Sequence, residues 1–287
     1  MKNVLKAILI VFVLVGSITT SSFAQNKEYI KVMTSNIRMA SKGDGINYWN
    51  NRRDWYADFV KFEGVDIFGA QEVLYSQLTD IQDRLPDYAH IGVGREGENK
   101  GEFSPIFYKK DKYEVLSSET FWLSPTPNEV GSKGWDAALP RIVTWARFKS
   151  KETGEEFYFF NTHFDHVGQE ARKQSAAMIK EKVAEVAGKL PAFVTGDFNV
   201  PPANAPYQEL TSGKNKMKDT YDEAAKKYGP SYTFNGFELE PDTNRDRIDY
   251  IFFNGKITIL TYQVMDGQRG KRFISDHFPI IVEAELK

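Results

Sequence analysis

The chain has 287 residues and no cysteine, and its 37 Lys and Arg residues nearly balance its 39 Asp and Glu residues, giving a formal net charge of -2. This length suits one large α/β domain or two small ones, and the lack of cysteine rules out disulfides and thiolate metal sites. The near balance of charge argues against a protein that coats nucleic acid regardless of sequence, because such binding needs many cations that neutralise phosphates.

Residues 1–24 are typical of a targeting segment. The stretch "MKNVLK" supplies positive charge, "AILIVFVLVG" is apolar over the length that a signal peptide uses, and "SFA" offers small residues at a cleavage point. The apolar stretch is shorter than the ~20 residues of a membrane-spanning helix, although an uncleaved anchor is the alternative. We therefore expect a signal peptide at residues 1–24, a single domain at residues 25–287, and a secreted or periplasmic protein without a stable membrane anchor.

The rest of the chain alternates predicted helices and strands. Helices are expected at residues 48–62, 74–85 and 169–187, from apolar residues that recur at three- and four-residue intervals. β-Branched and aromatic residues predict strands at residues 29–37, 65–72, 88–94, 103–109, 142–148, 155–164, 249–254, 256–265 and 277–286, and the apolar run 190–194 starts another. Runs of adjacent strands with interspersed helices favour two packed sheets flanked by helices.

Residues 124–140 form the longest segment without a periodic pattern. Loops of this length in compact domains are often binding or lid segments, so Trp135 could contact a ligand. The alternative is a self-packed surface loop with Trp135 inserted into the core.

Polar residues gather where the predicted strands end. Asp197 and Asn199 stand two positions apart, so both should project from one face at the end of a strand. The same kind of position is taken by Asn36, Arg38, Glu72, Asn161, His163, Asp165, Arg247, Asp249, Asp276 and His277. If these strand ends converge on one edge of two stacked sheets, they build a polar crater over an apolar floor.

The side-chain types indicate the chemistry of such a crater. Carboxylates at Glu72, Asp197, Asp249 and Asp276 would be costly together unless a cation or a proton intervenes. Oxygen ligands without cysteine favour a hard divalent ion, Mg²⁺ with Mn²⁺ as an alternative. Histidines, asparagines and arginines beside that ion suit an anionic substrate whose charge grows during reaction, so phosphate ester hydrolysis fits best.

In this order, "TSNIR", "GAQEV", "NTHFD", "TGDFN", "DRIDYIF" and "SDHFPI" resemble motifs of the endonuclease/exonuclease/phosphatase superfamily, the DNase I-like metal-dependent phosphoesterases. The resemblance runs from about residue 29 to the C-terminus and is nearest to uncharacterised exported bacterial members. It implies a four-layer α/β/β/α sandwich of two packed mixed β-sheets flanked by helices, with residues 25–287 as the catalytic domain. The two-sheet interpretation reached from the strand pattern agrees with this expectation.

The resemblance also implies roles for individual residues. Glu72 is similar to the family's Mg²⁺ ligand, Asn36 to the side chain that orients the metal shell, and Asp276 would lie near the metal. Arg38 and Arg141 are expected to bind the substrate phosphate. In the abasic-site endonuclease branch a carboxylate takes the place of Arg38, which puts a second metal site in doubt here.

The remaining assignments concern the reaction itself. Asp197 resembles the residue that positions or deprotonates the attacking water, and Asn199 resembles a donor to the phosphoryl oxygen. His277 resembles the histidine that contacts the phosphate, with Asp249 fixing its tautomer. The remaining catalytic pair by resemblance is His163 and Glu102.

Other residues are given structural roles by the same pattern. Asp165 is expected to cap the helix that begins near Gly168, and Arg247 to be a surface residue. His90 and His166 are interpreted as ordinary surface or loop histidines. The aromatic run 157–160 is interpreted as core rather than as a base-stacking platform.

The sequence thus predicts an exported Mg²⁺-dependent phosphoesterase that hydrolyses phosphodiester bonds. A nuclease or general phosphodiesterase is the first candidate. A hydrolase of phospholipids, inositol phosphates or sugar phosphates is the alternative, because the loops around such a crater select the substrate. A non-catalytic binding module on the same fold is the alternative of another class. The expected partner is a phosphate ester, with nucleic acid as one candidate, and the sequence indicates no protein partner.

Overall fold

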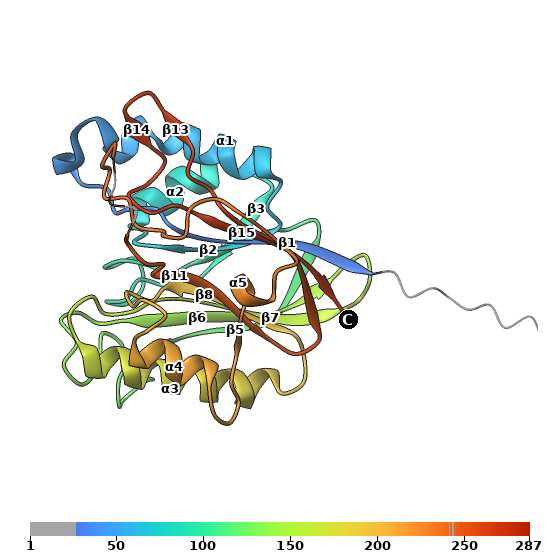
Figure 1. The fold of residues 1–287 in the computed structure, drawn as a ribbon. Helices are drawn as coiled ribbons and strands as arrows, with labels where there is room; N and C mark the ends of the chain where they lie inside the picture. The colour runs from blue at the N-terminus through green and yellow to red at the C-terminus, as the bar shows by residue number, and fades with distance from the viewer. Residues whose placement is uncertain (1–26, 241, 243) are drawn as a thin grey trace, which may run out of the picture.

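Two β-sheets packed face to face, with helices on both outer faces, form the four layers of the molecule (Figure 1). The computed structural model describes residues 27–240, 242 and 244–287, so the predicted signal peptide at residues 1–24 lies outside the described part. Within that part, no helix has the length and apolar character needed to cross a membrane. The predicted four-layer α/β/β/α sandwich is confirmed.

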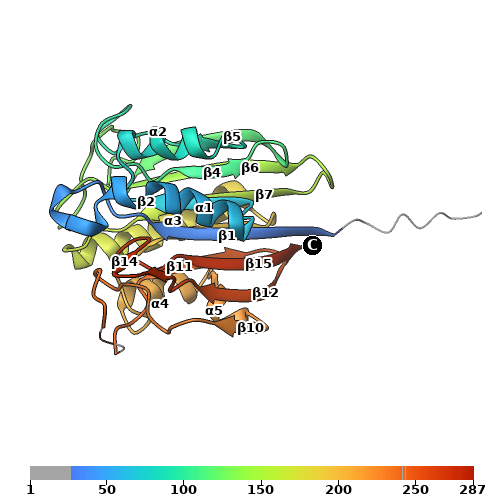
Figure 2. The ribbon, with the colours of Figure 1, turned by 90° about the horizontal axis from the view of Figure 1, so that it is seen from above.

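The first sheet contains seven strands and is mixed, since β1 pairs parallel with β2 and antiparallel with β15. Its strands, in spatial order, are β10 (Lys226–Tyr228), β12 (Ile257–Val264), β15 (Ile280–Leu286), β1 (Glu28–Asn36), β2 (Ile67–Gln71), β4 (Ile106–Lys109) and β3 (Tyr88–Ile91). Figure 2 shows α1 and α2 lying over one part of this sheet, with β12 and β10 extending beyond them.

The second sheet contains six strands and is also mixed, because β7 and β8 pair parallel while β8 and β11 pair antiparallel. Its strands, in spatial order, are β5 (Tyr113–Trp122), β6 (Ile142–Ser150), β7 (Glu156–His163), β8 (Ala192–Asp197), β11 (Asp249–Asn254) and β9 (Lys218–Asp219). A short hairpin of β13 (Gln268–Arg269) and β14 (Arg272–Phe273) stands apart from both sheets.

Helices cover the outer face of each sheet. The helical elements are the 3₁₀ turns η1 (Lys42–Asn47) and η2 (Trp49–Asn51), then α1 (Arg53–Glu63), α2 (Tyr75–Arg84), α3 (Gln169–Ala187), α4 (Ala205–Thr211) and α5 (Thr220–Glu223). Figure 1 shows α1 and α2 above the first sheet and α3 and α4 below the second. The helix predicted at residues 48–62 is therefore shorter at its start, where 3₁₀ turns replace it, and it ends at Gly64, whose φ of 64° suits glycine.

Apolar side chains project from both faces of the strands, and they form three layers of core, one between the sheets and one beneath the helices on each side. In β7, Phe157 and Phe159 face the other sheet, whereas Phe160 faces α3. All four aromatic residues at 157–160 are buried, which confirms their interpretation as core. A third cluster packs α1 and α2 against the first sheet through residues such as Met33 and Phe68. Hydrophobic burial on both faces of each sheet holds the layers in place.

One long strand was not predicted from the sequence. β5 (Tyr113–Trp122) is an edge strand whose middle residues, Ser117, Ser118 and Glu119, are exposed. Polar, exposed residues are common on edge strands, which natural sheets protect from further pairing. Such a strand lacks the apolar alternation by which half-buried strands are detected.

Candidate active site

Strand ends from both sheets meet at one edge of the sandwich. Asn36 is the last residue of β1, and Glu72 follows directly after β2. His163 and Asp197 end the parallel neighbours β7 and β8 and are paired in register, and Asp249 at the start of β11 pairs with Asp197 from the other side. Sheet register thus places Asp197 between two further polar residues, as the strand-end pattern predicted.

A pocket of about 470 Å³ opens at this edge. It is lined by Arg38, Met39, Glu72, Glu102, Leu139, Arg141, His163, His166, Asp197, Asn199, Phe234, Asp276 and His277. Nine of the eleven predicted site residues line it directly, and the other two, Asn36 and Asp249, are hydrogen-bonded to residues that do. The predicted set is therefore brought together in one place.

Asp197 lies between the two imidazoles of the pocket. Its Oδ2 is 3.5 Å from His163 Nε2 and 3.8 Å from His277 Nε2, and it accepts a hydrogen bond of 3.0 Å from Asn36 Nδ2. Burial, and then the neighbouring charge of Asp249, raise the pKa of Asp197 above the ordinary range of a carboxyl group. A carboxylate with raised pKa beside two imidazoles is suited to accept a proton near neutral pH.

His277 is held by Asp249, as the sequence predicted. Its Nδ1 lies 2.9 Å from Asp249 Oδ2, and both side chains are almost fully buried. Burial lowers the pKa of His277, but the carboxylates of Asp249 and Asp197 outweigh it and raise the pKa well above its ordinary value. His277 is therefore suited to carry a proton and to present Nε2–H toward Asp197 and the pocket.

His163 has the opposite electrostatic environment. Burial and the guanidinium of Arg141 lower its pKa well below the ordinary value. Its predicted partner Glu102 approaches Nδ1 only to 4.0 Å with Oε2, beyond hydrogen-bond distance, while Glu102 Oε1 pairs with Arg95 Nη2 at 2.9 Å. The pKa values of the two imidazoles are thus shifted in opposite directions, which is the separation that acid–base chemistry requires.

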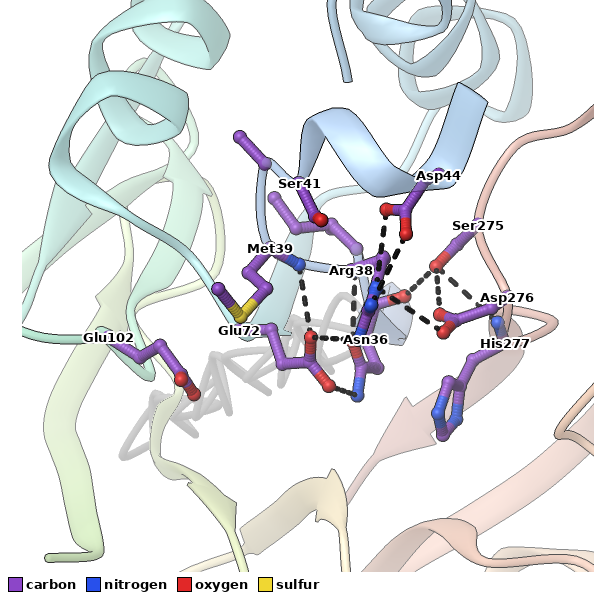
Figure 3. Close-up of polar contacts among 12 residues, drawn as sticks. Asn36, Arg38, Met39, Ser41, Asp44, Glu72, Glu102, Ser275, Asp276 and His277 are labelled. Atoms are coloured by element: carbon purple, nitrogen blue, oxygen red, sulfur yellow. Dashed lines mark hydrogen bonds and ion pairs between the residues drawn. The ribbon is translucent and has the colours of Figure 1, made fainter. Parts of the chain in front are cut away.

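The Glu72 carboxylate is fixed by two donors. Asn36 Nδ2 donates to Oε1 and Met39 N donates to Oε2, each at 3.0 Å (Figure 3). Burial raises the pKa of Glu72, but these hydrogen bonds, together with the charges of His277 and Arg38, leave the pKa below its ordinary value. Asn36 Oδ1 accepts from Arg38 N, so Asn36 presents its N–H groups to Glu72 and Asp197 rather than a ligand oxygen. This geometry fits an orienting residue better than a direct metal ligand.

Asp276 completes the acidic side of the pocket. It comes from the segment before β15, and burial, with the charge of Glu72, raises its pKa despite the opposing charge of His277. The guanidinium of Arg38 lies 3.8 Å from both Asp276 Oδ2 and Glu72 Oε2. Two carboxylates that share one cation form the electrostatic environment that favours a divalent ion.

The donor chemistry of the pocket fits a metal ion. Asp197, Asp249 and His277 place ligand atoms within 4.8 Å of one another and could hold an ion. The hydrogen bond between His277 Nδ1 and Asp249 already accounts for one of these contacts. Glu72 and Asp276 offer oxygen donors alone, the chemistry that a hard ion such as Mg²⁺ prefers. The predicted pair therefore remains our candidate for the metal.

Three non-glycine residues around the pocket adopt left-handed backbone conformations: Arg38 at φ 58°, Glu72 at φ 61° and Asn199 at φ 53°. Such conformations cost about 1–3 kcal/mol for side chains other than glycine and persist where surrounding contacts fix them. Asn199 shows these contacts, since its backbone N–H donates to Asp197 Oδ1 and its Nδ2 donates to Phe164 O. One of its amide protons is therefore already used, and its predicted role as a phosphoryl donor stays a prediction.

The 124–140 loop supplies one wall of the pocket. Asp136 accepts hydrogen bonds from Glu170 N and Ala171 N in the first turn of α3, and Leu139 N donates to Asp165. These contacts hold the loop against the start of α3 and the turn that precedes it. Trp135 stays 37% exposed, so the alternative that placed it in the core is wrong, while Leu139 lines the pocket.

Asp165 is a structural residue, as predicted, but the expectation that it caps α3 is wrong. Its Oδ1 accepts from Val167 N and Gly168 N before α3, while the first turn of α3 is capped by Asp136 instead. Burial raises the pKa of Asp165, but hydrogen bonds from the backbone N–H groups of this turn and of the 124–140 loop outweigh it and bring the pKa to about 2.

We expect Asp165→Asn to lower the free energy of unfolding by about 2 kcal/mol at neutral pH, because a charged acceptor of several N–H groups is lost. Since the pKa of Asp165 is depressed in the folded state, its contribution is complete above about pH 4 and disappears as pH falls through about pH 2. Denaturant unfolding of both proteins across this range measures it. A difference that did not shrink toward low pH would contradict the assignment.

Three sequence interpretations need correction. His166 is no ordinary loop histidine, because it lines the pocket and its Nδ1 lies 3.1 Å from Arg141 Nη2. Arg247 is buried rather than on the surface, paired with Asp219 at 3.0 Å. Asn161 does not reach the pocket either. Its Nδ2 donates to Ala70 O, and Gln71 Nε2 donates to its Oδ1.

The hydrogen bonds of Asn161 also show that the floor of the pocket is not the purely apolar one that the sequence had led us to expect. Beneath the pocket the two sheets meet through hydrogen bonds, and a Cβ on Gly69 would lie 2.3 Å from Asn161 Oδ1 and 2.2 Å from Thr195 Oγ1. Only glycine fits this close approach. His90 is not among the residues that line the pocket, but it lies half-buried in β3 against Phe107 rather than in a loop.

Pocket residues outside the strand ends were missed. Met39, Leu139, Phe234 and His166 come from loops, where no period marks their direction. The spacing of His163 and His166 in "NTHFDH" was the one signal that could have indicated His166. Arg141, which the resemblance did assign to the pocket, pairs with Asp165 at 3.5 Å, and burial lowers its pKa.

Comparisons with known proteins agree with this geometry. Residues 33–277 match the model of the Endonuclease/Exonuclease/phosphatase family. The structure resembles an endonuclease/exonuclease/phosphatase from Bacteroides vulgatus, with 45% identity, a TM-score of 0.88, and coverage of 91% of this chain and 100% of the other. It also resembles a mannosyl-6-phosphatase of Bacteroides thetaiotaomicron, with 41% identity, a TM-score of 0.84, and coverage of 89% and 99%.

A further relative is an uncharacterized protein of Acanthamoeba polyphaga mimivirus, 25% identical over 249 residues that cover 82% of this chain and 91% of the relative. The family match spans most of the chain, including the strand ends that carry Asn36, Glu72, His163, Asp197 and Asp249. The chain belongs to the endonuclease/exonuclease/phosphatase family.

Proposed function

We propose that this protein is an exported, divalent-metal-dependent phosphoesterase whose preferred substrate is the phosphate ester of a small hydroxylated molecule such as a sugar. The observation that carries the reaction type is the position of Asp197 between two imidazoles, with Asn36 joining it to Glu72. This arrangement supports a reaction in which a proton acceptor, a protonated histidine and a metal carboxylate act around one pocket.

The chain's own residues divide the work of hydrolysis. Asp197 aligns a water and accepts its proton as the oxygen attacks phosphorus, and the ester P–O bond breaks to release the oxygen of the alcohol. His277, protonated and held by Asp249, donates to a phosphoryl oxygen as negative charge develops there. Asn199 fixes Asp197 through its backbone N–H. His163, kept neutral by burial and by Arg141, can take the proton of the water from Asp197 at Nε2 and pass it to the leaving oxygen.

Mg²⁺, or Mn²⁺ in its place, would be held by Glu72 and Asp276, and when bound it supplies a Lewis acid that stabilises charge on the phosphoryl and leaving oxygens. Asn36 orients Glu72 for this purpose through its hydrogen bond of 3.0 Å.

The substrate class rests on the pocket and on one relative. A volume of about 470 Å³ is sufficient for a small ligand. Leu139 of the 124–140 loop and Arg141, just after this loop, line the pocket, and Phe234 lies on its lining as well. A relative with 41% identity is named as a mannosyl-6-phosphatase, so we place the sugar phosphate ahead of the phosphodiester that the sequence put first.

A nuclease is the second candidate. It is supported by the family's chemistry and by the cations Arg38, Arg95 and Arg141 around the pocket. The chain's net charge of -2 provides no large excess of cations for binding a long polyanion. The binding-module alternative has less support, because the acid–base residues of the pocket are all present. Export rests on the signal-like pattern of residues 1–24.

The test is a hydrolysis panel on the mature protein before and after chelation. We expect hydrolysis of mannose 6-phosphate and p-nitrophenyl phosphate to exceed that of bis-p-nitrophenyl phosphate, single-stranded DNA and phospholipid vesicles. Chelation should remove activity and Mg²⁺ or Mn²⁺ should restore it, because Glu72 and Asp276 carry charge that needs a cation. Activity that survives thorough chelation would refute metal dependence, and preference for the diester or DNA would restore the nuclease to first place.

A further inference from the structure

Arg38 is surrounded by three carboxylates, and two of them are the candidate metal ligands. Its Nη2 lies 3.2 Å from Asp44 Oδ1 and its Nε lies 3.3 Å from Asp44 Oδ2. Its Nη1 lies 3.8 Å from Glu72 Oε2 and its Nε lies 3.8 Å from Asp276 Oδ2. Figure 3 shows the Arg38 side chain between Asp44, Glu72 and Asp276.

The backbone of Arg38 is fixed by groups outside these ion pairs. Its carbonyl oxygen accepts hydrogen bonds of 2.9 Å from both Arg52 Nη2 and Gln77 Nε2, and its N–H donates to Asn36 Oδ1. Its φ of 58° is a conformation that a side chain other than glycine rarely adopts. The surrounding structure therefore fixes the backbone from which this side chain extends, and the guanidinium at its end lies beside the acidic pair.

We propose that Arg38 is the counter-cation of the Glu72–Asp276 pair, that a divalent ion competes with it for these carboxylates, and that the released guanidinium, still held by Asp44, binds the substrate phosphate. The inference rests on the proposed metal-dependent function and adds a residue that couples the two binding events. Without an ion, Arg38 supplies the positive charge that buried carboxylates need. With an ion bound, that charge becomes redundant at Glu72 and Asp276 and is available to an anion.

The contacts support an exchange of partners rather than a permanent ion pair. The two distances of 3.8 Å lie beyond hydrogen-bond distance, whereas the Asp44 contacts are within it. Arg38 is also one-third exposed at its side chain, whereas Glu72 and Asp276 are 15% and 11% exposed. The guanidinium is thus loosely bound to the metal carboxylates, anchored at Asp44 and open toward the pocket that it lines.

The inference predicts opposite effects of one substitution on two ligands. In Arg38→Gln, Mn²⁺ should bind about tenfold more tightly, the change expected when two partly exposed ion pairs no longer compete. Inorganic phosphate should bind the Mn²⁺-loaded variant about tenfold more weakly, because a charge-assisted contact is lost. A merely structural role for Arg38 would weaken both ligands together.

The measurement is calorimetric titration of the full-length mature protein with Mn²⁺ alone and then, at saturating Mn²⁺, with inorganic phosphate. Arg38→Lys keeps the charge and should stay near the wild type for Mn²⁺. Arg147→Gln is the matched control, since Arg147 pairs with Glu156 on β6 and β7 away from the pocket lining. Arg38→Ala provides the same comparison should the glutamine variant be unstable.

The outcomes separate this inference from the proposed function. Mn²⁺ binding to the wild type together with equal or weaker binding to Arg38→Gln would overturn the inference and leave the metal-dependent function in place. Absence of Mn²⁺ binding to the wild type would overturn the proposed function and the inference with it. Tighter Mn²⁺ binding and weaker phosphate binding in Arg38→Gln, with Arg147→Gln unchanged, would support both.

Discussion

Asp197→Asn is expected to lower kcat for phosphate ester hydrolysis by about 10³-fold, because the proton acceptor between His163 and His277 is lost while its shape is kept. The substitution also removes a buried carboxylate whose pKa is raised by burial and by Asp249. A carboxyl group with raised pKa destabilises the folded state at neutral pH. The variant should therefore keep or exceed the wild-type Tm while it loses turnover.

Steady-state kinetics with p-nitrophenyl phosphate and thermal unfolding of the same preparations measure the two effects. Asp54→Asn is the matched control, since its carboxylate makes an exposed pair with Arg84 on the outer helices. Turnover by Asp197→Asn within about tenfold of the wild type would show that Asp197 is not the proton acceptor. A large drop in Tm would instead indicate that Asp197 acts mainly in holding Asn36 and the histidines.

Glu72→Gln is expected to lower kcat/KM by at least about 100-fold and to weaken Mn²⁺ binding by a similar factor. Glutamine keeps an oxygen that can accept from Met39 N but carries no charge. The pKa of Glu72 lies below its ordinary value, so the wild-type group is ionised at neutral pH and available to a cation. The direction of the Mn²⁺ effect is opposite to that expected for Arg38→Gln.

Hydrolysis as a function of Mn²⁺ concentration, with direct Mn²⁺ titration, tests this assignment. High Mn²⁺ should rescue part of the activity if the defect lies in metal affinity. Glu156→Gln on β7 is a suitable control, because its carboxylate pairs with Arg147 outside the pocket lining. Unchanged Mn²⁺ affinity in Glu72→Gln would contradict this assignment and favour a metal site at Asp197, Asp249 and His277 instead.

Strand ends were the most informative feature of the sequence. Asp197 and Asp249 are paired in register on neighbouring strands, and His163 is paired with Asp197 on the other side. The sequence placed these residues at strand ends, and the strand order of the sheet, which the sequence did not predict, makes those ends adjacent. The hydrogen bond between His277 and Asp249 was likewise expected from the family resemblance and is present at 2.9 Å.

The strand pattern did not show how close each strand-end residue lies to the opposite sheet. Asn161 and His163 project from one face of β7, two positions apart, yet Asn161 joins the sheets and His163 lines the pocket. A period of two fixes the face of a strand but not the distance to the opposite sheet. That distance is set at Gly69, where the sheets approach too closely for any other residue.

The sequence by itself determined the layered fold, the family and most of the residues that meet at the pocket, because strand period and ordered motifs are local properties of the chain. Only the tertiary structure decided the partners of Arg38, the burial of Arg247 against Asp219, and the place of His166 beside Arg141. Ion pairs and pocket walls join segments that are distant in sequence. The energy of an ion pair depends on its burial and on the distance between the charges, and both are set only when the chain folds.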